Sequence, residues 1–237
     1  MPDDALSRVH TLTFDIFGTV LDLVGSIRPT LDAFLTEHGA AIGGATFWPE
    51  WRTRQRVEQH QDTILMLGHP GYLDSARRAL VYCLRKHGID FHQAEVERFM
   101  RVFEELRPYD DAVDGLKRLG ERYRLVALSN GNTWLVEHLV ENNIGADFDS
   151  AISVDRVGRF KPHPSVYRYA ARQLECEAAQ IMMVAAHSFD ILGARACDYR
   201  GAYVNRYGLP YESSSLQPDL TVADFNELAD RLLDAAE

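Results

Sequence analysis

Near its start, the chain reads Thr11-Leu12-Thr13-Phe14-Asp15-Ile16-Phe17-Gly18-Thr19-Val20-Leu21-Asp22. The apolar and β-branched residues before Asp15 predict a buried β-strand, which would carry the Asp15 carboxyl group at its C-terminal end. Gly18 can adopt a backbone conformation that a side chain would forbid, so we expect the chain to turn there. Ligands of open α/β sheets bind at that end of the strands. Asp15 is therefore a candidate functional residue, although a turn-forming or capping aspartate gives the same short pattern.

One long helical segment interrupts an alternation of strands and helices. In that segment we expect helices at 29–37, 47–67, 72–87 and 92–106. Later strands are expected at 124–128, 151–154, 180–185 and 201–205, and later helices at 112–121, 134–143, 164–174, 191–197 and 222–235. The alternation predicts an α/β fold, a Rossmann-like doubly wound parallel sheet with an inserted α-helical cap domain. We place the core domain at 1–22 and 107–237 and the cap domain at 23–106.

Charge and composition exclude several classes of partner. The formal net charge of −10 and the isoelectric point near 5.4 argue against nucleic acids and anionic membranes, which need a basic face. The three cysteines at positions 83, 176 and 197 form no disulfide or metal pattern, so we expect buried thiols in a reducing compartment. The polar, acidic residues 1–8 make no signal peptide, and no apolar run is long enough to span a bilayer. We therefore expect a soluble, cytoplasmic protein.

Three further stretches place polar groups near the ends of predicted strands. Ser129 and Asn130 follow the second core strand and could hold an anion, although such residues are also common in ordinary turns. Lys161 lies in a loop stiffened by prolines and would keep a nearby carboxylate ionised, unless it is a surface lysine. Asp190 follows another apolar strand and would approach Asp15, and two close carboxylates repel unless a metal or a lysine lies between them.

Together these motifs resemble the haloacid dehalogenase superfamily of hydrolases, and the resemblance extends from Thr11 to Glu237. In that family the aspartate at the position of Asp15 is the nucleophile. Members that act on phosphate usually carry a second aspartate two residues later, where this chain has Phe17. The resemblance therefore points to the metal-free 2-haloacid dehalogenases and implies no cofactor. Lys161, rather than magnesium, is the expected counter-charge for Asp15 and Asp190.

The resemblance also implies roles for other residues. Ser129, with Thr19 and nearby backbone amides, would hold the substrate carboxylate, and Asn130 would help to hold the departing halide. Arg52, which follows Trp51 in the cap, would assist that halide, because a guanidinium is always charged and offers several donors. The remaining matches are Tyr167, a family site tyrosine six positions after Lys161, and the aromatic residues Tyr72, Phe17 and Phe189, which could line a small desolvated chamber or belong to the core.

Four positions depart from the family. Ala185 and His187 stand where the dehalogenases have Ser and Asn, and Phe189 replaces a usual Trp. His187 could orient water or accept a proton near neutral pH, and a structural histidine is an equal alternative. Arg56 lies one helical turn after Arg52, where the family usually has an apolar residue. If both arginines point inward, the substrate is larger or more anionic than a simple haloacetate; otherwise Arg56 is a surface charge.

The function that these residues predict is covalent hydrolysis at a saturated carbon. Asp15 would attack C2 of a short L-2-haloacid, release halide, and form an aspartyl ester that water converts to a 2-hydroxy acid. One alternative is a related hydrolase acting on another 2-substituted carboxylic acid. A phosphatase is less favoured because Phe17 cannot act as an acid or base, and a non-catalytic module that binds a small acid is the remaining alternative. Dimers are common in the family, so a homodimer is a further hypothesis.

Overall fold

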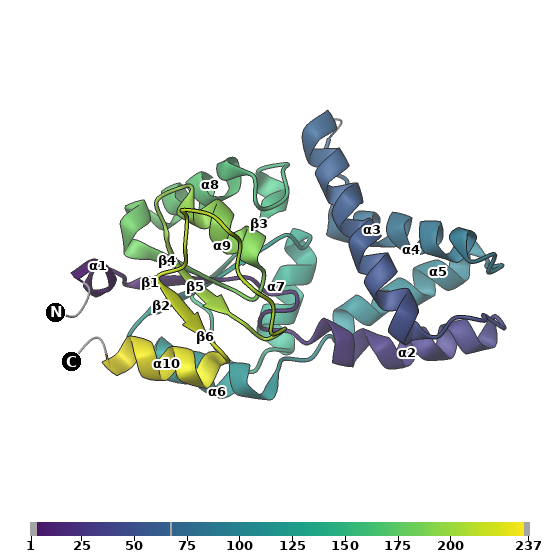
Figure 1. Ribbon diagram of the computed structural model, residues 1–237, viewed down its shortest axis with the longest axis horizontal. Coiled ribbons are helices and arrows are strands. Elements are labelled where there is room, and N and C mark those ends of the chain that lie inside the picture. Colours follow the sequence, from purple (N-terminus) through teal and green to yellow (C-terminus); the bar gives the residue numbers. More distant parts are fainter. Residues whose placement is uncertain (1–3, 67, 235–237) are drawn as a thin grey trace.

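The computed structural model describes residues 4–66 and 68–234. Figure 1 shows that these residues form two parts, a sheet flanked by helices and a separate group of helices on one side of it. The chain leaves the sheet after its first strand, builds the separate helices, and then returns to complete the sheet.

The described residues contain a sheet of six parallel strands in the order β3-β2-β1-β4-β5-β6. The strands are β1 (Thr11–Phe14), β2 (Arg124–Ser129), β3 (Ser150–Ser153), β4 (Ile181–Ala185), β5 (Arg200–Val204) and β6 (Leu220–Val222). Phe14 in the central strand β1 lies opposite Ala127 in β2 and Val184 in β4. Both β1 and β4 are buried over their whole length, as expected of central strands in a parallel sheet: β4 is apolar throughout, and β1 alternates threonine with apolar residues. The predicted parallel α/β fold is confirmed.

Helices cover both faces of the sheet. The helices α6 (Asp110–Gly120) and α10 (Phe225–Asp234) pack together on one face, and α8 (Pro164–Leu174) and α9 (Ser188–Arg195) lie on the other (Figure 1). The helix α7 (Thr133–Asn142) connects β2 to β3. The short N-terminal helix α1 (Asp4–Ser7) was not expected from the sequence.

The separate group contains four α-helices beyond the C-terminal end of β1 (Figure 1). They are α2 (Leu23–Glu37), α3 (Gly44–Leu65), α4 (Tyr72–Lys86) and α5 (Gln93–Met100), and a 3-10 helix (Arg101–Glu105) follows them. Two antiparallel segments connect this group to the sheet. The Asp22 N–H donates to the Arg107 carbonyl oxygen over 2.8 Å, and the Tyr109 N–H donates to the Val20 carbonyl oxygen over 3.0 Å.

Several predicted boundaries need correction. The helix expected from residue 29 begins at Leu23, because the Asp22 carboxylate caps it by accepting the Gly25 N–H, and Pro29 is accommodated inside the helix. The helix expected at 191–197 begins at Ser188, so Phe189 and Asp190 lie in its first turn. The helix expected at 92–106 ends at Met100 and tightens into the 3-10 turn.

The predicted helix at 222–235 is wrong in its first part, because Val222 belongs to the edge strand β6 and α10 begins only at Phe225. The expected helix ends at Leu67 and Ala235 lie outside the described residues.

The cysteines are free thiols, as the sequence suggested, but only Cys83 and Cys197 are buried. Cys176 is partly exposed, which corrects the expectation of three buried thiols. Across residues 4–66 and 68–234, no helix combines the length and the apolar character needed to cross a membrane.

Candidate active site

Two buried carboxylates share one buried ammonium group where the strands end. Lys161 Nζ donates to Asp15 Oδ1 over 2.9 Å, to Asp190 Oδ2 over 2.6 Å and to the Leu128 carbonyl oxygen over 2.7 Å. The side chains of Lys161 and Asp190 are almost completely buried, and Asp15 keeps 5% of its surface exposed. All three donors of the ammonium group are therefore used, and its charge lies between the two acids.

Neighbouring parallel strands bring these groups together. Asp15 follows β1, and its N–H donates to the Val184 carbonyl oxygen in β4 over 3.0 Å. Asp190 lies in the first turn of α9, directly after β4. The loop after β3 supplies Lys161, whose N–H donates to Asn130 Oδ1 over 2.8 Å. The carboxyl ends of three adjacent strands and the loop after a fourth therefore build one site.

The shared ammonium group separates the pKa values of the two acids. Burial alone would raise the pKa of Asp15, but the charge of Lys161 and its hydrogen bond hold that pKa below its ordinary value. Burial raises the pKa of Asp190 to about 6, and the negative charge of Asp15 contributes to the rise. Asp15 is therefore the acid that stays ionised across the wider pH range.

The same geometry decides whether a divalent cation fits beside Asp15 and Asp190. The Lys161 ammonium already compensates Asp15 and Asp190, and residue 17, which could supply a further oxygen ligand, is Phe17. Within the described part of the chain, no group of three or more His, Cys, Asp or Glu side chains could hold a metal ion. The donors around Asp15 thus do not fit magnesium, which takes oxygen ligands.

Thr19 orients the nucleophile candidate. Its hydroxyl donates to Asp15 Oδ2 over 2.8 Å and accepts the Ala186 N–H over 2.9 Å. The Thr19 side chain is completely buried. Because its one hydroxyl proton is directed at Asp15, Thr19 fixes this carboxylate and has no donor left for a substrate carboxylate.

Ser129 is the last residue of β2, and Asn130 begins the turn that follows it, next to Asp15. Ser129 is buried, and its Oγ accepts the Gly131 N–H over 3.1 Å. The Asn130 amide oxygen accepts the Lys161 N–H, and 8% of this residue is exposed. No hydrogen bond of its amide nitrogen is recorded among the described residues, so this donor is available to a ligand.

Tyr167 lies behind Asp190 and has no exposed surface. Its hydroxyl donates to Asp190 Oδ1 over 2.6 Å. Burial, followed by the charge of Asp190, raises the pKa of Tyr167 well above its ordinary value, so the hydroxyl stays a neutral donor. The family resemblance assigns Tyr167 to substrate binding; in the structure its hydroxyl instead orients Asp190.

The helical group contributes Arg52 and Tyr72. Arg52 donates to the Tyr72 hydroxyl over 2.9 Å and to Gln55 Oε1. The Tyr72 ring stacks on Phe17 with 4.4 Å between the ring centroids, which joins the helical group to the loop after β1. Phe189 lies elsewhere: it stacks on His187, and the Arg56 guanidinium lies 5.5 Å above its ring. The expected aromatic chamber is thus divided into two separate contacts.

A cavity of about 520 Å³ lies between the helical group and the sheet. Its lining residues are Leu23, Val24, Trp48, Pro49, Arg52 and Arg56 from one side, and Ala186, His187, Ser188, Phe189, Tyr203, Tyr207, Leu209 and Pro210 from the other. Both arginines therefore face the same space. The lining does not include Asp15, Ser129 or Lys161. Asp15 nevertheless lies close to the cavity wall, because Thr19 hydrogen-bonds Asp15 and also accepts the N–H of Ala186, which forms part of that wall.

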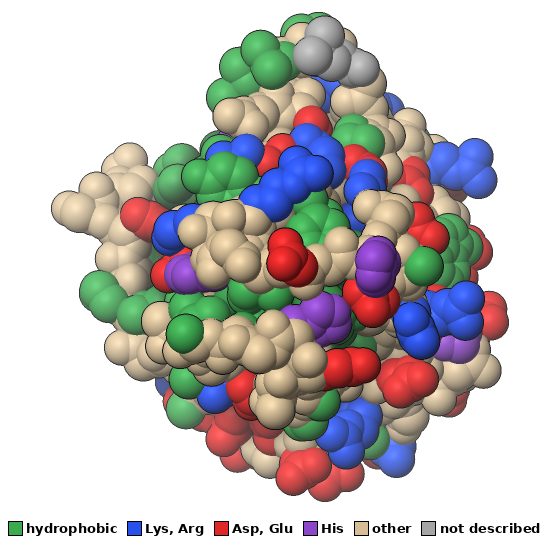
Figure 2. Space-filling view, turned by 90° about the vertical axis from the view of Figure 1, so that its right-hand side faces the viewer, with side chains coloured by type: hydrophobic (Ala, Val, Ile, Leu, Met, Phe, Trp, Pro, Cys, Tyr) green, Lys and Arg blue, Asp and Glu red, His purple; other side chains and the backbone are tan. Residues whose placement is uncertain are grey.

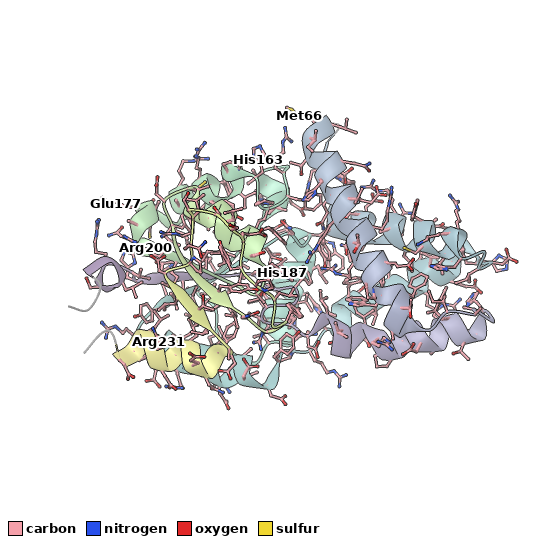
Figure 3. All side chains as sticks on the ribbon, in the orientation of Figure 1. Met66, His163, Glu177, His187, Arg200 and Arg231 are labelled. Carbon is pink, nitrogen blue, oxygen red and sulfur yellow. The ribbon has the colours of Figure 1, made fainter. Side chains whose placement is uncertain are left out.

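His187 lies between the sheet and α3 (Figure 3). Its Nε2 is 3.3 Å from the Phe17 carbonyl oxygen, and because that oxygen can only accept, Nε2 carries the proton. Burial lowers the pKa of His187 to about 4, and the charges of Arg56 and Arg52 contribute, although Asp15 opposes them. His187 is therefore neutral near pH 7. This corrects the idea of a proton acceptor that titrates near neutral pH.

Sequence reasoning did not identify Tyr207 or the contacts that hold the helical group in place. The Tyr207 hydroxyl donates to the Gly18 carbonyl oxygen over 2.8 Å, and its ring stacks on His187. The Leu73 N–H donates to Asn132 Oδ1 over 3.1 Å, and His69 Nε2 lies 3.2 Å from Asp155 Oδ1. These residues belong to no recognisable motif, so only their spatial neighbours reveal them.

Comparisons with known proteins place this geometry in context. A family model described as haloacid dehalogenase-like hydrolase matches residues 9–198. Haloacetate dehalogenase H-2 of Moraxella sp. (strain B) is 26% identical over 219 residues, which cover 92% of this chain and 95% of the relative. (S)-2-haloacid dehalogenase H-109 of Pseudomonas putida is 28% identical over 231 residues, covering 97% and 100%. A solved structure that also matches is L-2-haloacid dehalogenase from Xanthobacter autotrophicus with chloropropionic acid covalently bound. Its TM-score is 0.81 and its sequence identity 25%, and the match covers 95% of this chain and 98% of that chain.

Proposed function

The chain belongs to the haloacid dehalogenase-like hydrolase family, and we propose that it displaces halide from C2 of a short (S)-2-haloacid. The product is a 2-hydroxy acid, formed through an ester on Asp15. The names of the relatives, (S)-2-haloacid dehalogenase and haloacetate dehalogenase, support this reaction. So does the relative whose structure holds chloropropionic acid covalently. The observation in this chain that carries the proposal is the buried Asp15 carboxylate, which Lys161 keeps ionised.

In the first step, an Asp15 carboxylate oxygen attacks C2 of the substrate. A carbon–oxygen bond forms, the carbon–halogen bond breaks, and its electron pair leaves with the halide. Water hydrates a carboxylate and weakens it as a nucleophile, so the desolvated position of Asp15 favours attack. Thr19 and Lys161 fix the two oxygens and limit the orientations of the group. Attack opposite to the halogen inverts C2, so an (S)-2-chloro acid gives the (R)-2-hydroxy acid.

Negative charge develops on the halogen during this step. We assign its stabilisation to the Arg52 guanidinium and the Asn130 amide nitrogen, which are donors of the kind that a leaving anion needs. Contacts that strengthen as the charge develops lower the barrier, because they stabilise the transition state more than the bound substrate. We assign the substrate carboxylate to Ser129 and the backbone N–H groups of the turn after β2.

In the second step, water adds to the carboxyl carbon of the Asp15 ester. The ester's acyl–oxygen bond breaks, the 2-hydroxy acid leaves with the original Asp15 oxygen, and the water oxygen remains in the Asp15 carboxylate. Neutral His187 can orient this water through Nδ1, since its Nε2 proton is directed at Phe17. Asp190, positioned by Lys161 and Tyr167, is the nearby acid whose pKa of about 6 suits the transfer of a proton.

A single turnover in heavy-oxygen water tests this function. Excess enzyme is mixed with (S)-2-chloropropionate, and the peptide that contains Asp15 is weighed by mass spectrometry. We expect one heavy oxygen in that peptide and little in the first molecules of lactate. The peptide that contains Asp190 is the internal control and remains unlabelled, and the Asp15→Asn variant releases no chloride.

Two results would contradict the proposal. Heavy oxygen in the lactate with none in the Asp15 peptide would show that water attacks C2 directly. Absence of chloride release from (S)-2-chloropropionate, (S)-2-chlorobutanoate, chloroacetate, (S)-2-chlorosuccinate and (S)-2-chloroglutarate would reject the dehalogenase function and favour another 2-substituted acid or a binding module.

We further propose residues 1–22 and 107–237 as the core domain and residues 23–106 as the cap domain. The antiparallel segments at Asp22 and Arg107 support these limits, because the chain passes from one part to the other there. A cytoplasmic location is supported by three free thiols, which a reducing compartment preserves. A homodimer stays a prediction that light scattering of the purified protein can test.

A further inference from the structure

Arg52 and Arg56 present two positive charges to one cavity. They lie four positions apart on α3, so they share a face of that helix, and both line the 520 Å³ space above the sheet. Arg56 lines this cavity and is at the same time exposed to solvent. Partial burial of its guanidinium group, and then the charge of Arg52, lowers the pKa of Arg56. Since an arginine remains protonated even so, the cavity carries two cations at neutral pH.

Neither cation has an acidic partner within the described residues. Arg52 donates to Tyr72 and Gln55, which are neutral, and Arg56 contacts the face of the Phe189 ring. By contrast, Arg54 pairs with Glu58, and Lys86 pairs with Glu50. Figure 2 accordingly shows basic and acidic side chains interspersed on the outer surface of this group. The two cavity arginines are thus unneutralised in a chain whose net charge is −10.

A simple haloacid would leave one of the two cavity arginines without a ligand. Its one carboxylate is assigned to the turn after β2, and Arg52 faces the developing halide, which leaves Arg56 without a ligand. The cavity volume also exceeds what such an acid needs, because pockets of about 300 to 1,000 Å³ bury drug-sized molecules. The additional space and the additional cation lie on the same side of the site.

We propose that the substrate is a 2-halo dicarboxylic acid whose second carboxylate binds Arg56. This inference rests on the proposed function and specifies its substrate class. The apolar walls of Trp48, Phe189 and Tyr207 would enclose the methylene groups between the two carboxylates. In acids of four or five carbon atoms, one or two methylene groups separate C2 from this second carboxylate, and these acids are therefore the ones to test.

The test compares pairs of substrates that differ in one terminal group. The pairs are (S)-2-chlorosuccinate with (S)-2-chlorobutanoate, and (S)-2-chloroglutarate with (S)-2-chloropentanoate. For each pair, kcat/KM gives a ratio of dicarboxylate to monocarboxylate. We expect the wild type to favour the dicarboxylate in at least one pair. Arg56→Gln lowers that ratio about 10- to 100-fold, the loss of a hydrogen bond between charged groups, and Arg56→Lys retains part of it.

Arg231→Gln is the matched control. Arg231 is an exposed residue of α10 and lies away from the cavity (Figure 3). Its substitution therefore changes the net charge by the same amount as Arg56→Gln without altering the site. This variant keeps the wild-type ratio. A wild-type preference for the monocarboxylate in both pairs, or a ratio that Arg56→Gln changes less than threefold, would overturn the inference while leaving the dehalogenase function intact.

Binding without chemistry separates the two proposals. Calorimetry measures the affinity of wild type and Arg56→Gln for succinate, glutarate and butanoate. Tighter binding of a dicarboxylate that depends on Arg56 would support this inference even if no haloacid were turned over. Equal binding of the dicarboxylates by both proteins would reject it, whatever the outcome of the chloride-release assay.

Discussion

Asp15 and Lys161 form an ion pair that protein surrounds almost completely, with 2.9 Å between Oδ1 and Nζ. A buried charge without its partner is strongly destabilising, since neither water nor an opposite charge compensates it. Lys161 compensates two acids, because Asp190 Oδ2 lies 2.6 Å from the same nitrogen. The pair therefore links the stability of the core to the ionisation of the proposed nucleophile.

Lys161→Met removes the shared cation and leaves two buried carboxylates. We expect the free energy of unfolding to fall by about 3–5 kcal/mol in urea denaturation at pH 7. Lys117→Met, an exposed residue of α6, is the matched control and changes it by less than about 0.5 kcal/mol. Adding Asp190→Asn to Lys161→Met should recover part of the loss. An unfolding free energy equal to that of wild type would contradict the role of Lys161.

Tyr167→Phe removes the hydroxyl that donates to Asp190 Oδ1. This hydrogen bond lowers the pKa of Asp190, so its loss moves that pKa further above 6. Asp190 transfers its proton in the second step, after the halide has left, so its ionisation governs kcat. We expect kcat to fall as the pH drops through this pKa, and the variant to show that fall at higher pH. Tyr199→Phe serves as the control, because this buried hydroxyl donates to the Tyr167 carbonyl oxygen instead. Identical pH profiles for Tyr167→Phe and wild type would reject the positioning role.

His187 makes the fold sensitive to acid. Burial lowers its pKa from the ordinary value of 6.5 to about 4, so between these values the unfolded chain takes up the proton first. The free energy of unfolding therefore declines as the pH falls from 6.5 to 4, by roughly 2–3 kcal/mol from this residue. The decline is smaller in His187→Gln, measured by urea denaturation across this range. His60→Gln, an exposed position on α3, keeps the wild-type slope, and a wild-type slope in His187→Gln would disprove the assignment.

Gly71→Ala tests how the helical group is held on the core. A Cβ on Gly71 would overlap with the Asn132 amide, whose oxygen accepts the Leu73 N–H. We expect a loss of about 1–3 kcal/mol in unfolding free energy and a lower kcat/KM. Gly68→Ala is the control, since Gly68 also has a positive φ but no atom lies within 4 Å of its added Cβ. Equal effects of both substitutions would assign the loss to backbone strain alone.

Chelation tests the charge arrangement at Asp15. Because Lys161 supplies the cation between the two acids, we expect EDTA to leave kcat and KM for (S)-2-chloropropionate unchanged. Loss of activity in EDTA that added magnesium restores would contradict this expectation. The control is the same enzyme after the EDTA has been removed by dialysis.

The sequence by itself determined the parallel α/β fold, the helical segment between the first strand and the rest, and the order of the motifs. It could do so because strands buried on both faces are apolar throughout, and because parallel strands bring their carboxyl ends to one edge. Asp15, Ser129 and Asp190 were placed near one another by that rule alone. Boundaries such as Leu23 and Ser188 were missed, because a single capping contact or one buried turn decides them.

The tertiary structure decided what each side chain faces. Thr19 and Tyr167 point at the two carboxylates and away from the cavity, whereas Arg56 lines it together with Arg52. The protonation of His187 likewise follows from burial beside cations that come from a distant helix. Orientation, burial and pKa depend on neighbours far away in the sequence, and local patterns carry no record of those neighbours. The sequence named Arg52 and Arg56 as candidates, and the position of α3 over the sheet decided that both face one cavity.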